Sequence, residues 1–322
     1  MPCARSCGKA CVLSQSHRCG LAAPGRFTPT SDMAMTQKHT APVLVIGATG
    51  RIGRLVVDEL LAAHVSVRAL SRNPESADMP GGAEVVFGDL TMPESLDAAL
   101  GGVRAVFLVW VAPLASAPAA IARIAAHTKR IVYLSAPHQT AHPVFQQPNP
   151  MSTMHAELER LIKAAALTYT FIRPGMFAGN VVYWWAPQIR SGDTVSWPYA
   201  AAATAPIDER DIARVAAHAL YEDGFANGDY VLTGPESLTQ ADQVRIIGET
   251  LGRFIRFAEL SPEEFRRQTS GTWPPLVVDM LLNAWHAAVG LPAYVTTSVG
   301  DLTGTPARTF RRWAEDHRET FQ

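Results

Sequence analysis

Cysteine is absent from most of this chain of 322 residues. The four cysteines lie close to the N-terminus, at Cys3, Cys7, Cys11 and Cys19. The rest of the chain forms no disulfide, which excludes the disulfide-rich secreted class. The C-x3-C-x3-C spacing leaves a metal site and a disordered tail open, but it lacks the C-x2-C pairs of zinc modules. We expect residues 1–40 to be a disordered extension, with Met33 or Met35 as an alternative start.

Long apolar runs and an excess of one charge are also missing. No window holds an uncharged apolar run long enough to cross a bilayer. The N-terminal stretch lacks the sustained apolar segment of a signal peptide. With 28 Lys and Arg residues against 29 Asp and Glu residues, the net charge of −1 indicates neither nucleic acid nor an anionic membrane as a partner. We therefore expect a cytoplasmic monomer or homodimer that binds a small molecule.

Short apolar runs alternate with helical patterns after residue 40. The runs that predict strands cover residues 42–47, 65–70, 83–89, 104–110, 130–136, 168–173 and 228–234. Helical patterns begin at about residue 51 and recur at 93–100, 117–127, 151–166, 207–223, 237–253, 261–268, 274–290 and 306–321. This alternation predicts an α/β fold, a Rossmann doubly wound parallel sheet with a small, mainly helical C-terminal lobe. Residues 180–199 mix aromatic and turn residues and look less regular than the segments before them.

Three glycines follow the first predicted strand, in the stretch VLVIGATGRIG. We expect Gly47 to turn the chain, Gly50 to remove a side chain where a ligand approaches, and Gly53 to let the helix pack closely on the strand. A purely structural turn is the alternative. The position between a buried strand and an amphipathic helix favours a dinucleotide, whose diphosphate would meet helix N-terminal amides. Further cofactor contacts are expected from Thr49, Arg51 and Ile52.

Arg72 lies where the second predicted strand ends. Folds that select NAD usually place an acidic residue there, and no Asp or Glu occurs between Leu61 and Pro74. A guanidinium can pair with the 2′-phosphate of NADP, so the sequence favours NADP(H) and leaves NAD(H) open. A solvated surface arginine is the alternative interpretation. Asp89, followed by Leu90, ends the third strand, where its carboxylate can accept from the adenine amino group.

A series of motifs resembles a known family. In chain order they are GATGRIG, VRALSRNP, FGDL, HAELE, YTFIRPGMFAGN, DERDIARVAAHAL and YVLTGPESLTQ. Over about residues 42–318 the chain is similar to the NmrA-like group of atypical short-chain dehydrogenase/reductases. The resemblance implies a Rossmann domain that binds NADP(H) and a small lobe that closes a substrate cleft. Its members reduce quinones, dyes or other conjugated acceptors, or sense the dinucleotide without turnover.

The resemblance also implies a division of the chain. We expect one domain over residues 41–322. Its Rossmann core comprises residues 41–175 and about 207–234, and its substrate lobe about 176–206 and 235–322.

The Y-x-x-x-K pair of ordinary short-chain dehydrogenases does not occur in this sequence, which argues against their alcohol–ketone mechanism. By resemblance, His155 occupies the helix position where relatives carry Lys or His, and it either anchors the nicotinamide ribose or donates a proton. Glu159, one helical turn later, either orients the imidazole or stabilises the helix and the following connection. Ser135 matches the residue that faces the nicotinamide, with a turn cap as the alternative. His155 and Ser135 are the candidate catalytic residues.

Other positions follow from the resemblance alone. A loop that begins at Val109 and Trp110 would pass over the cofactor ribose. Pro174, Gly175 and Phe177 would form the nicotinamide-side loop, which ends at a polar residue, Asn180.

Aromatic residues gather after that loop. Tyr183, Trp184 and Trp185 are consecutive, and Trp197 is near. Such clusters form either core or flat apolar walls for a quinone-like ring. The candidate substrate pocket comprises Phe177, Asn180, Tyr183, Trp184 and Trp185.

No convincing metal site occurs, because His138 and His142 lie in a predicted loop and Asp208 and Asp211 match a helix start.

The sequence predicts an NADPH-dependent reductase that transfers hydride to a quinone-like, aromatic or otherwise conjugated small molecule. Two alternatives stay open. One is a non-catalytic NADP(H)-sensing regulator that binds a protein partner, and the other is an accessory protein of a biosynthetic pathway.

Overall fold

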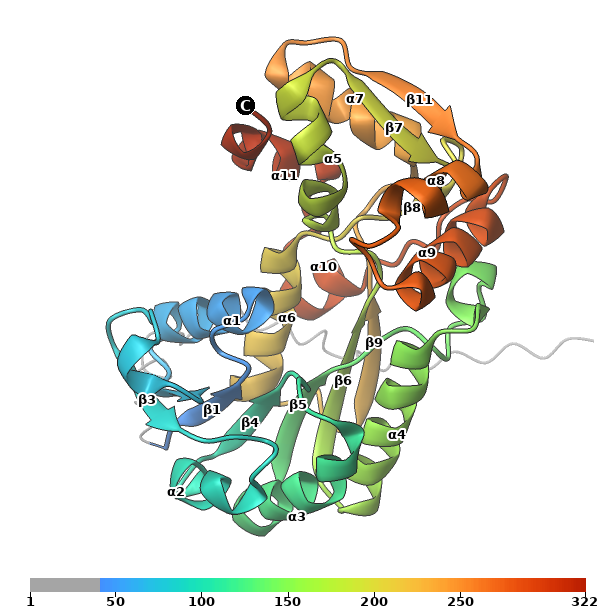
Figure 1. Ribbon diagram of the computed structural model, residues 1–322. Coiled ribbons are helices and arrows are strands. Elements are labelled where there is room, and N and C mark those ends of the chain that lie inside the picture. The colour runs from blue at the N-terminus through green and yellow to red at the C-terminus, as the bar shows by residue number, and fades with distance from the viewer. Residues whose placement is uncertain (1–40) are drawn as a thin grey trace, which may run out of the picture. The chain divides into compact units, whose positions relative to one another are not determined.

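A parallel sheet of seven strands lies at the centre of residues 41–322, the part of the chain that this computed structural model describes (Figure 1). The cysteines and the expected extension lie outside the described residues. The strands are β1 (Val43–Ile46), β2 (Val67–Ser71), β3 (Ala83–Phe87), β4 (Ala105–Leu108), β5 (Arg130–Leu134), β6 (Thr168–Pro174) and β9 (Gly228–Leu232). Their order is β3-β2-β1-β4-β5-β6-β9, and every neighbouring pair is parallel. The predicted Rossmann sheet is confirmed.

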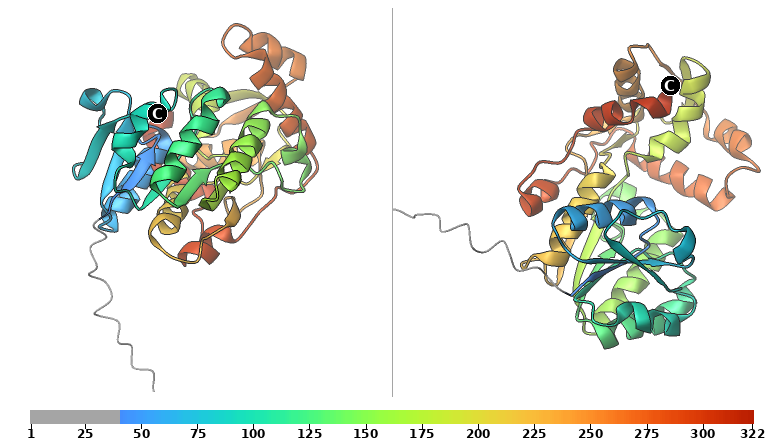
Figure 2. Two further views of the ribbon diagram at one scale, coloured as in Figure 1. Left: turned by 90° about the horizontal axis from the view of Figure 1, so that it is seen from below. Right: turned by 90° about the vertical axis from the view of Figure 1, so that its left-hand side faces the viewer.

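Helices cover both faces of the sheet (Figure 2). One face carries α1 (Arg51–Ala62) and α6 (Glu209–Tyr221), and the other carries α2 (Leu96–Leu100), α3 (Ala117–His127) and α4 (Pro150–Ala164). Along β1, Val43 and Val45 belong to the first core, and Leu44 and Ile46 to the second. Successive strand residues point to opposite faces, so a strand that is covered twice is apolar throughout.

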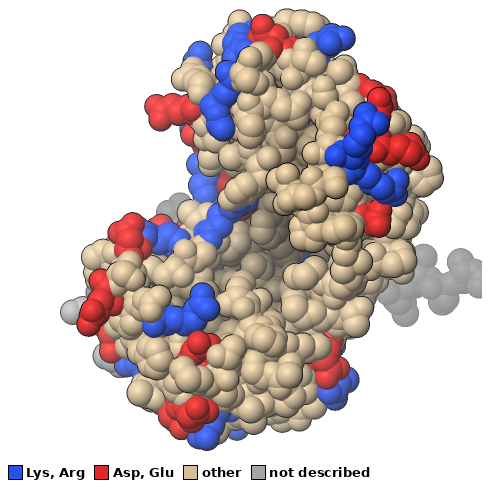
Figure 3. All heavy atoms as spheres, viewed as in Figure 1, with Lys and Arg blue, Asp and Glu red and all other residues tan. Residues whose placement is uncertain are grey.

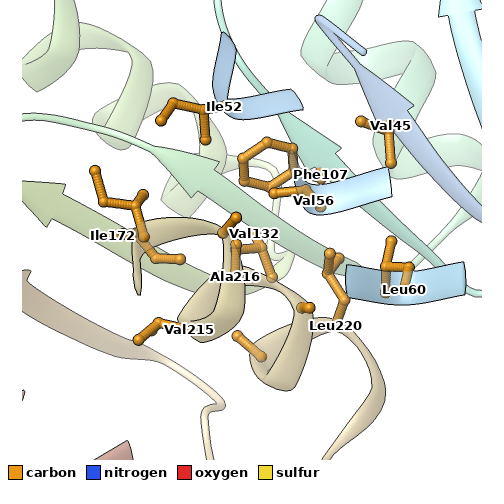
Figure 4. Packing of buried hydrophobic residues seen from close by; sticks show 14 of the residues in the cluster. Val45, Ile52, Val56, Leu60, Phe107, Val132, Ile172, Val215, Ala216 and Leu220 are labelled. Atoms are coloured by element: carbon orange, nitrogen blue, oxygen red, sulfur yellow. The ribbon is translucent and has the colours of Figure 1, made fainter. Parts of the chain in front are cut away.

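The first core packs α1 and α6 together over the strands. Figure 4 shows the residues that meet there, among them Val56, Leu60, Phe107, Val132, Val215 and Leu220.

The strand order reverses between β1 and β4. Open parallel sheets bind ligands at such a reversal, outside the carboxyl ends of their strands. The loops after β1, β4, β5 and β6 therefore meet at the edge where a ligand is expected.

A lobe made of later segments lies beyond this edge (Figure 1). Its elements are α5 (Asn180–Ser191), β7 (Thr194–Pro198), β8 (Ala203–Thr204), β10 (Leu238–Thr239), α7 (Gln240–Leu251), β11 (Arg256–Leu260), α8 (Pro262–Thr269), α9 (Pro275–Ala288) and α11 (Phe310–Asp316). β7 pairs with β11 in parallel, and β8 pairs with β10 antiparallel. The core of the lobe is rich in buried aromatic rings, including Trp185, Trp197, Trp285 and Trp313.

The remaining helix, α10 (Ser298–Thr303), packs on α6 and β9, and its Val299 lies in the first core of the sheet. This segment falls within the range 235–322 that we expected to form the lobe. We therefore call the seven strands with α1–α4, α6 and α10 the sheet half, and the other elements the lobe.

The lobe also differs from the sequence expectation in secondary structure. Residues 180–199, which look less regular in the sequence, form α5 and β7, and α5 continues through Pro187. None of the helices within residues 41–322 combines the length and the apolar content that crossing a membrane requires.

Candidate active site

The glycine turn after β1 has the tight geometry that the sequence predicts. Gly47 has φ +86°, and a Cβ there would lie 2.8 Å from the Cβ of Val109. A Cβ on Gly53 would lie 2.0 Å from the carbonyl oxygen of Gly47. Neither position admits a larger residue unless the backbone moves. A Cβ on Gly50 would meet only the Gly47 carbonyl oxygen, at 3.3 Å, so the chain is open on its outer side.

The first turn of α1 offers backbone donors to a ligand. Its N-cap, Gly50, provides no side-chain cap, and the turn contains no acidic residue, whereas α4, α6 and α7 each begin with a side-chain cap. The amides of Arg51, Ile52 and Gly53 therefore retain the partial positive charge of a helix N-terminus. This part of the chain fits the diphosphate of a dinucleotide.

Arg51 directs its side chain to the lobe. Its Nη1 donates to Glu209 Oε1 at 3.0 Å, and its guanidinium lies 5.1 Å from the ring centroid of Tyr183. Glu209 also accepts from the amide of Gly179, at 3.0 Å. Arg51 thus joins the glycine turn to the start of α5, which leaves its amide as the group that faces a diphosphate. Ile52 is buried in the core, so it too has only its amide to offer, whereas Thr49 is exposed.

Arg72 and Asp89 lie at the carboxyl ends of β2 and β3. Arg72 is exposed just beyond β2. Asp89 Oδ1 accepts from the amide and the hydroxyl of Thr91, each at 2.8 Å. These hydrogen bonds lower the pKa of Asp89, and the nearby charge of Arg72 lowers it further. Asp89 therefore shapes the turn after β3 as an ionised carboxylate, while the Arg72 guanidinium is open to solvent.

Three of the expected cofactor contacts, Leu90, Val109 and Trp110, lie among packed residues. Val109 packs against Gly47, whereas Leu90 and Trp110 are 4% and 5% exposed. The side chains of Leu90 and Trp110 lie in the second core of the sheet, so they are packing residues.

Ser135 belongs to a buried polar network at the end of β5. Its Oγ donates to Glu159 Oε1 at 2.6 Å. Glu159 in turn accepts from Arg173 of β6 through both oxygens, Nε to Oε1 at 2.9 Å and Nη2 to Oε2 at 2.7 Å. Arg173 also contacts Asp229 and Gln139. Because the Ser135 proton is committed to Glu159, the hydroxyl has only lone pairs left for a ligand.

His155 is held by Tyr133 and not by Glu159. The hydroxyl of Tyr133 and Nδ1 of His155 are 2.6 Å apart. Tyr133 is fully buried, and burial raises the pKa of its hydroxyl, so the group stays protonated and donates to Nδ1. Burial, with a smaller contribution from His138, lowers the pKa of His155 to about 4. The ring is neutral at pH 7 and carries its proton on Nε2, as a fixed donor.

The expectation that Glu159 orients the His155 imidazole is therefore wrong. Both residues lie on α4, but the carboxylate of Glu159 is saturated by Arg173 and Ser135. The alternative, that Glu159 stabilises the following connection, agrees with its bidentate pair to β6. Sequence reasoning missed Tyr133 and Arg173, because each reaches its partner only across the fold.

The nicotinamide-side loop forms where β6 ends. Pro174 is the last strand residue and is buried, and the amide of Gly175 donates to the carbonyl of Leu232 at 2.9 Å. Phe177 forms a bridge with Ile207 and packs on the first core. This loop is therefore fixed between β6, β9 and the segment that enters α6.

A cavity of about 290 Å³ lies between the carboxyl edge of the sheet and the lobe. From the sheet half it is lined by Ala136, Pro137, His138, Val144, Phe145, Gln147, Asn149, Ser152 and Met176, and from the lobe by Asn180, Trp184, Thr204, Met280, Leu281, Ala284 and Trp285. Ser152 lies one helical turn before His155 on α4, which places the cavity beside the two candidate catalytic residues. The wall from α9 was not expected from the sequence.

The consecutive aromatic residues of α5 separate in three directions. Trp184 lines the cavity, with its ring 5.5 Å from that of Trp285 and nearly perpendicular to it, at 86°. Trp185 is fully buried in the lobe, and Tyr183 is 67% exposed and faces Arg51. Of the five residues expected to form the pocket, Trp184 and Asn180 line this cavity, whereas Phe177, Tyr183 and Trp185 do not. Tyr183, Trp184 and Trp185 diverge because neighbouring helix residues point about 100° apart, and Phe177, which precedes α5, packs on the first core.

His138 and the predicted helix-start acids have separate structural roles. His138 Nδ1 donates to the carbonyl of Ala136 at 2.9 Å, and its Nε2 is 3.8 Å from Glu159 Oε2. Asp208 caps α6 by accepting from the amide of Arg210, and Asp211 accepts from the amide of Arg308. Over residues 41–322 there is no group of three or more His, Cys, Asp or Glu residues that could hold a metal ion.

Comparisons with known proteins agree with this arrangement. A family model described as NAD(P)H-binding matches residues 47–223. The chain is 37% identical to a (4-alkanoyl-5-oxo-2,5-dihydrofuran-3-yl)methyl phosphate reductase of Streptomyces griseus subsp. griseus, over 87% of this chain and 99% of that protein. It is 31% identical to an NAD(P)H azoreductase of Xenophilus azovorans, again over 87% and 99%. An NADPH-dependent quinone oxidoreductase of Escherichia coli shares the fold with a TM-score of 0.73, at 24% identity over 87% of this chain and 100% of that one.

Proposed function

Because this chain belongs to the NAD(P)H-binding family, with the NmrA-like resemblance of its motifs confirmed, we propose that it is an NADPH-dependent reductase of a quinone-like, aromatic or otherwise conjugated small molecule. Two relatives above 30% identity that match it along nearly their whole length are reductases by name. Each acts on a conjugated compound, an unsaturated lactone in one case and an azo compound in the other.

One observation carries this proposal. The cavity with two indole walls opens at the same edge of the sheet as the glycine turn, among residues that directly follow β5 and β6. A dinucleotide on the turn and a flat acceptor in the cavity would therefore meet at the carboxyl edge (Figure 3 shows this face hollowed between the two halves). Reduced nicotinamide supplies a hydride when bound, and alignment in a dry pocket is the main contribution of the protein.

The side chains at this edge are suited to orientation. His155 presents a neutral Nε2–H donor that Tyr133 fixes, and Ser135 presents an acceptor that Glu159 fixes. A neutral imidazole whose conjugate acid has a pKa of about 4 is a poor proton donor at pH 7. Of the two roles considered for His155, we therefore favour an anchor for the nicotinamide ribose. The exposed guanidinium of Arg72 supports a preference for the phosphorylated cofactor.

The test is acceptor-dependent oxidation of NADPH by the purified protein, followed as the loss of reduced-nicotinamide absorbance with quinones, azo dyes and unsaturated lactones. We expect turnover with at least one acceptor class and none with the variant Gly53→Val, whose added side chain closes the turn. NADPH binding by calorimetry without turnover on any acceptor would reject the reductase and favour the sensing regulator.

A further inference from the structure

The walls of the acceptor cavity carry no side chain of Asp, Glu, Lys or Arg within residues 41–322. Two hollows that share lining residues with it extend this pattern. The smaller, of about 40 Å³, shares Val144, Phe145, Met176 and Thr204 with it and has no Asp, Glu, Lys or Arg in its lining. The larger, of about 600 Å³, shares Asn149 and Met280, and its one charged lining residue is the acidic Asp279. A ligand in this space therefore meets apolar and neutral polar atoms.

The guanidinium of Arg173, which belongs to the polar network at the end of β5, is not available to a ligand. Arg173 is 4% exposed, and its guanidinium is occupied by Glu159, Asp229 and Gln139. Within the described part of the chain, His138 is the one lining residue of the acceptor cavity itself with a titratable side chain. Its Nε2 lies 3.8 Å from Glu159 Oε2, so this side of the ring already faces a carboxylate. The neighbouring imidazole of His155 stays neutral at pH 7. Figure 3 agrees, with Lys and Arg along the rim of the hollow and other residues inside it.

From this lining, and on the basis of the proposed function, we propose that the site selects uncharged acceptors. It takes a planar conjugated carbonyl compound and rejects the same ring system when that carries a sulfonate or a phosphate. An anion that enters loses its hydration and finds no counter-ion, which is among the largest penalties in binding. A neutral quinone loses little hydration and gains contact with Trp184, Trp285 and Met280.

The inference separates this chain from a relative at 37% identity. That reductase is named for a phosphate ester, and a phosphate dianion calls for Arg or Lys at the acceptor. We therefore expect this protein to prefer a dephosphorylated butenolide to its phosphate.

The experiment compares 1,4-naphthoquinone with 1,4-naphthoquinone-2-sulfonate on the full-length protein. Binding is measured by quenching of tryptophan fluorescence without cofactor and with NADP⁺, and turnover is measured with NADPH. We expect the sulfonate to bind at least about 100-fold more weakly and to be reduced with a correspondingly lower kcat/KM. The sulfonate is the more electron-poor quinone, so its intrinsic reactivity would act in the opposite direction.

A positive charge placed in the cavity tests whether the lack of a counter-ion is the reason that the sulfonate binds weakly. Met280→Arg should tighten binding of the sulfonate about tenfold and weaken binding of the neutral quinone, which loses its contact with Met280. Val277→Arg adds the same charge to an exposed site of α9 outside the cavity, and it should change neither.

The outcomes separate this inference from the proposed function. If the neutral quinone binds selectively but no acceptor is reduced, charge selection stands and the reductase fails. If both quinones bind and react equally, or if neither binds, charge selection is overturned whatever the turnover shows.

Discussion

The sheet half and the lobe meet at the cavity, but they are held together by different means. At the edge of the sheet half, Glu159, Arg173 and Ser135 form a connected polar network with almost no exposure to solvent. The lobe packs indole rings around each other, and the buried Nε1 atoms of Trp185, Trp197 and Trp313 have no hydrogen-bond partner among the described residues. A hydrogen-bond network fixes the orientation of the polar side chains in it, whereas packed rings determine the size and shape of the space between them. The sheet half is therefore suited to aligning a cofactor, and the lobe to shaping the space for an acceptor.

The largest effect is expected from Glu159→Gln, which tests whether the polar network stabilises the edge of the sheet half. The change leaves the buried guanidinium of Arg173 without its bidentate partner, which we expect to lower the free energy of unfolding by about 4 kcal/mol. Denaturant titration at neutral pH measures the loss. Glu157→Gln is the matched control, because it removes an exposed ion pair with Arg160 from the same helix and should have little effect. Equal stability of the two variants would mean that the network is not what holds the edge.

The next largest effect is expected in the pH dependence of the free energy of unfolding, to which His155 of the sheet half contributes. The pKa of His155 is about 4 in the folded protein against 6.5 as the ordinary value, so the unfolded chain takes up this proton first as the pH falls. His155 therefore contributes to the loss of stability as the pH falls from 6.5 toward 4, by up to about 3 kcal/mol, and contributes no slope above that window. His155→Gln should remove this part of the slope. His286→Gln, at an exposed position in the lobe, should retain it.

The cofactor side is tested by Arg72→Glu. We expect the affinity for NADPH to fall by about 2 kcal/mol more than that for NADH, roughly 30-fold, because the guanidinium is replaced by a like charge opposite the 2′-phosphate. Calorimetric titration with both cofactors measures the difference. Arg256→Glu makes the same charge change at an exposed site in the lobe and should leave the two affinities in their original ratio. Equal weakening of both cofactors by Arg72→Glu would remove the reason for preferring NADPH.

The smallest effect is expected from Trp185→Phe in the lobe. The substitution leaves a small void, but it also removes a buried N–H that has no acceptor. These terms oppose each other, so the variant should lose only about 1 kcal/mol. Thermal unfolding compared with Trp185→Ala, which loses the whole ring, checks the sign. A loss close to that of the alanine variant would show that the indole N–H has a partner of its own.

The fold of the sheet half was largely predictable because its sequence patterns depend on contacts between residues that are close together in the chain. Val43–Ile46 is continuously apolar and is followed by glycines at fixed spacing, and both features record contacts within one strand–turn–helix unit. The start of α1, which has no side-chain cap, belongs to the same strand–turn–helix unit and was predictable for the same reason. The network at Glu159 was not predictable, since Arg173 and Ser135 reach it from two other elements.

The lobe was harder for a related reason. Trp184 and Trp185 are adjacent in sequence, and only the helix through Pro187 decides that one lines the cavity and the other is core. The opposite wall comes from α9, far along the chain. No periodicity within residues 180–199 carries that information.

The placement of α10 has a practical consequence for anyone who wishes to exchange acceptor specificity between relatives. The polypeptide leaves the sheet half after β9, builds most of the lobe, returns to seat Val299 against α6, and leaves again for α11. A single cut after β9 would thus strip a piece of the dinucleotide-binding scaffold together with the acceptor module. Chimaeras should instead transplant α5–β8, β10–α9 and α11 as three inserts, with Ser298–Thr303 kept from the host.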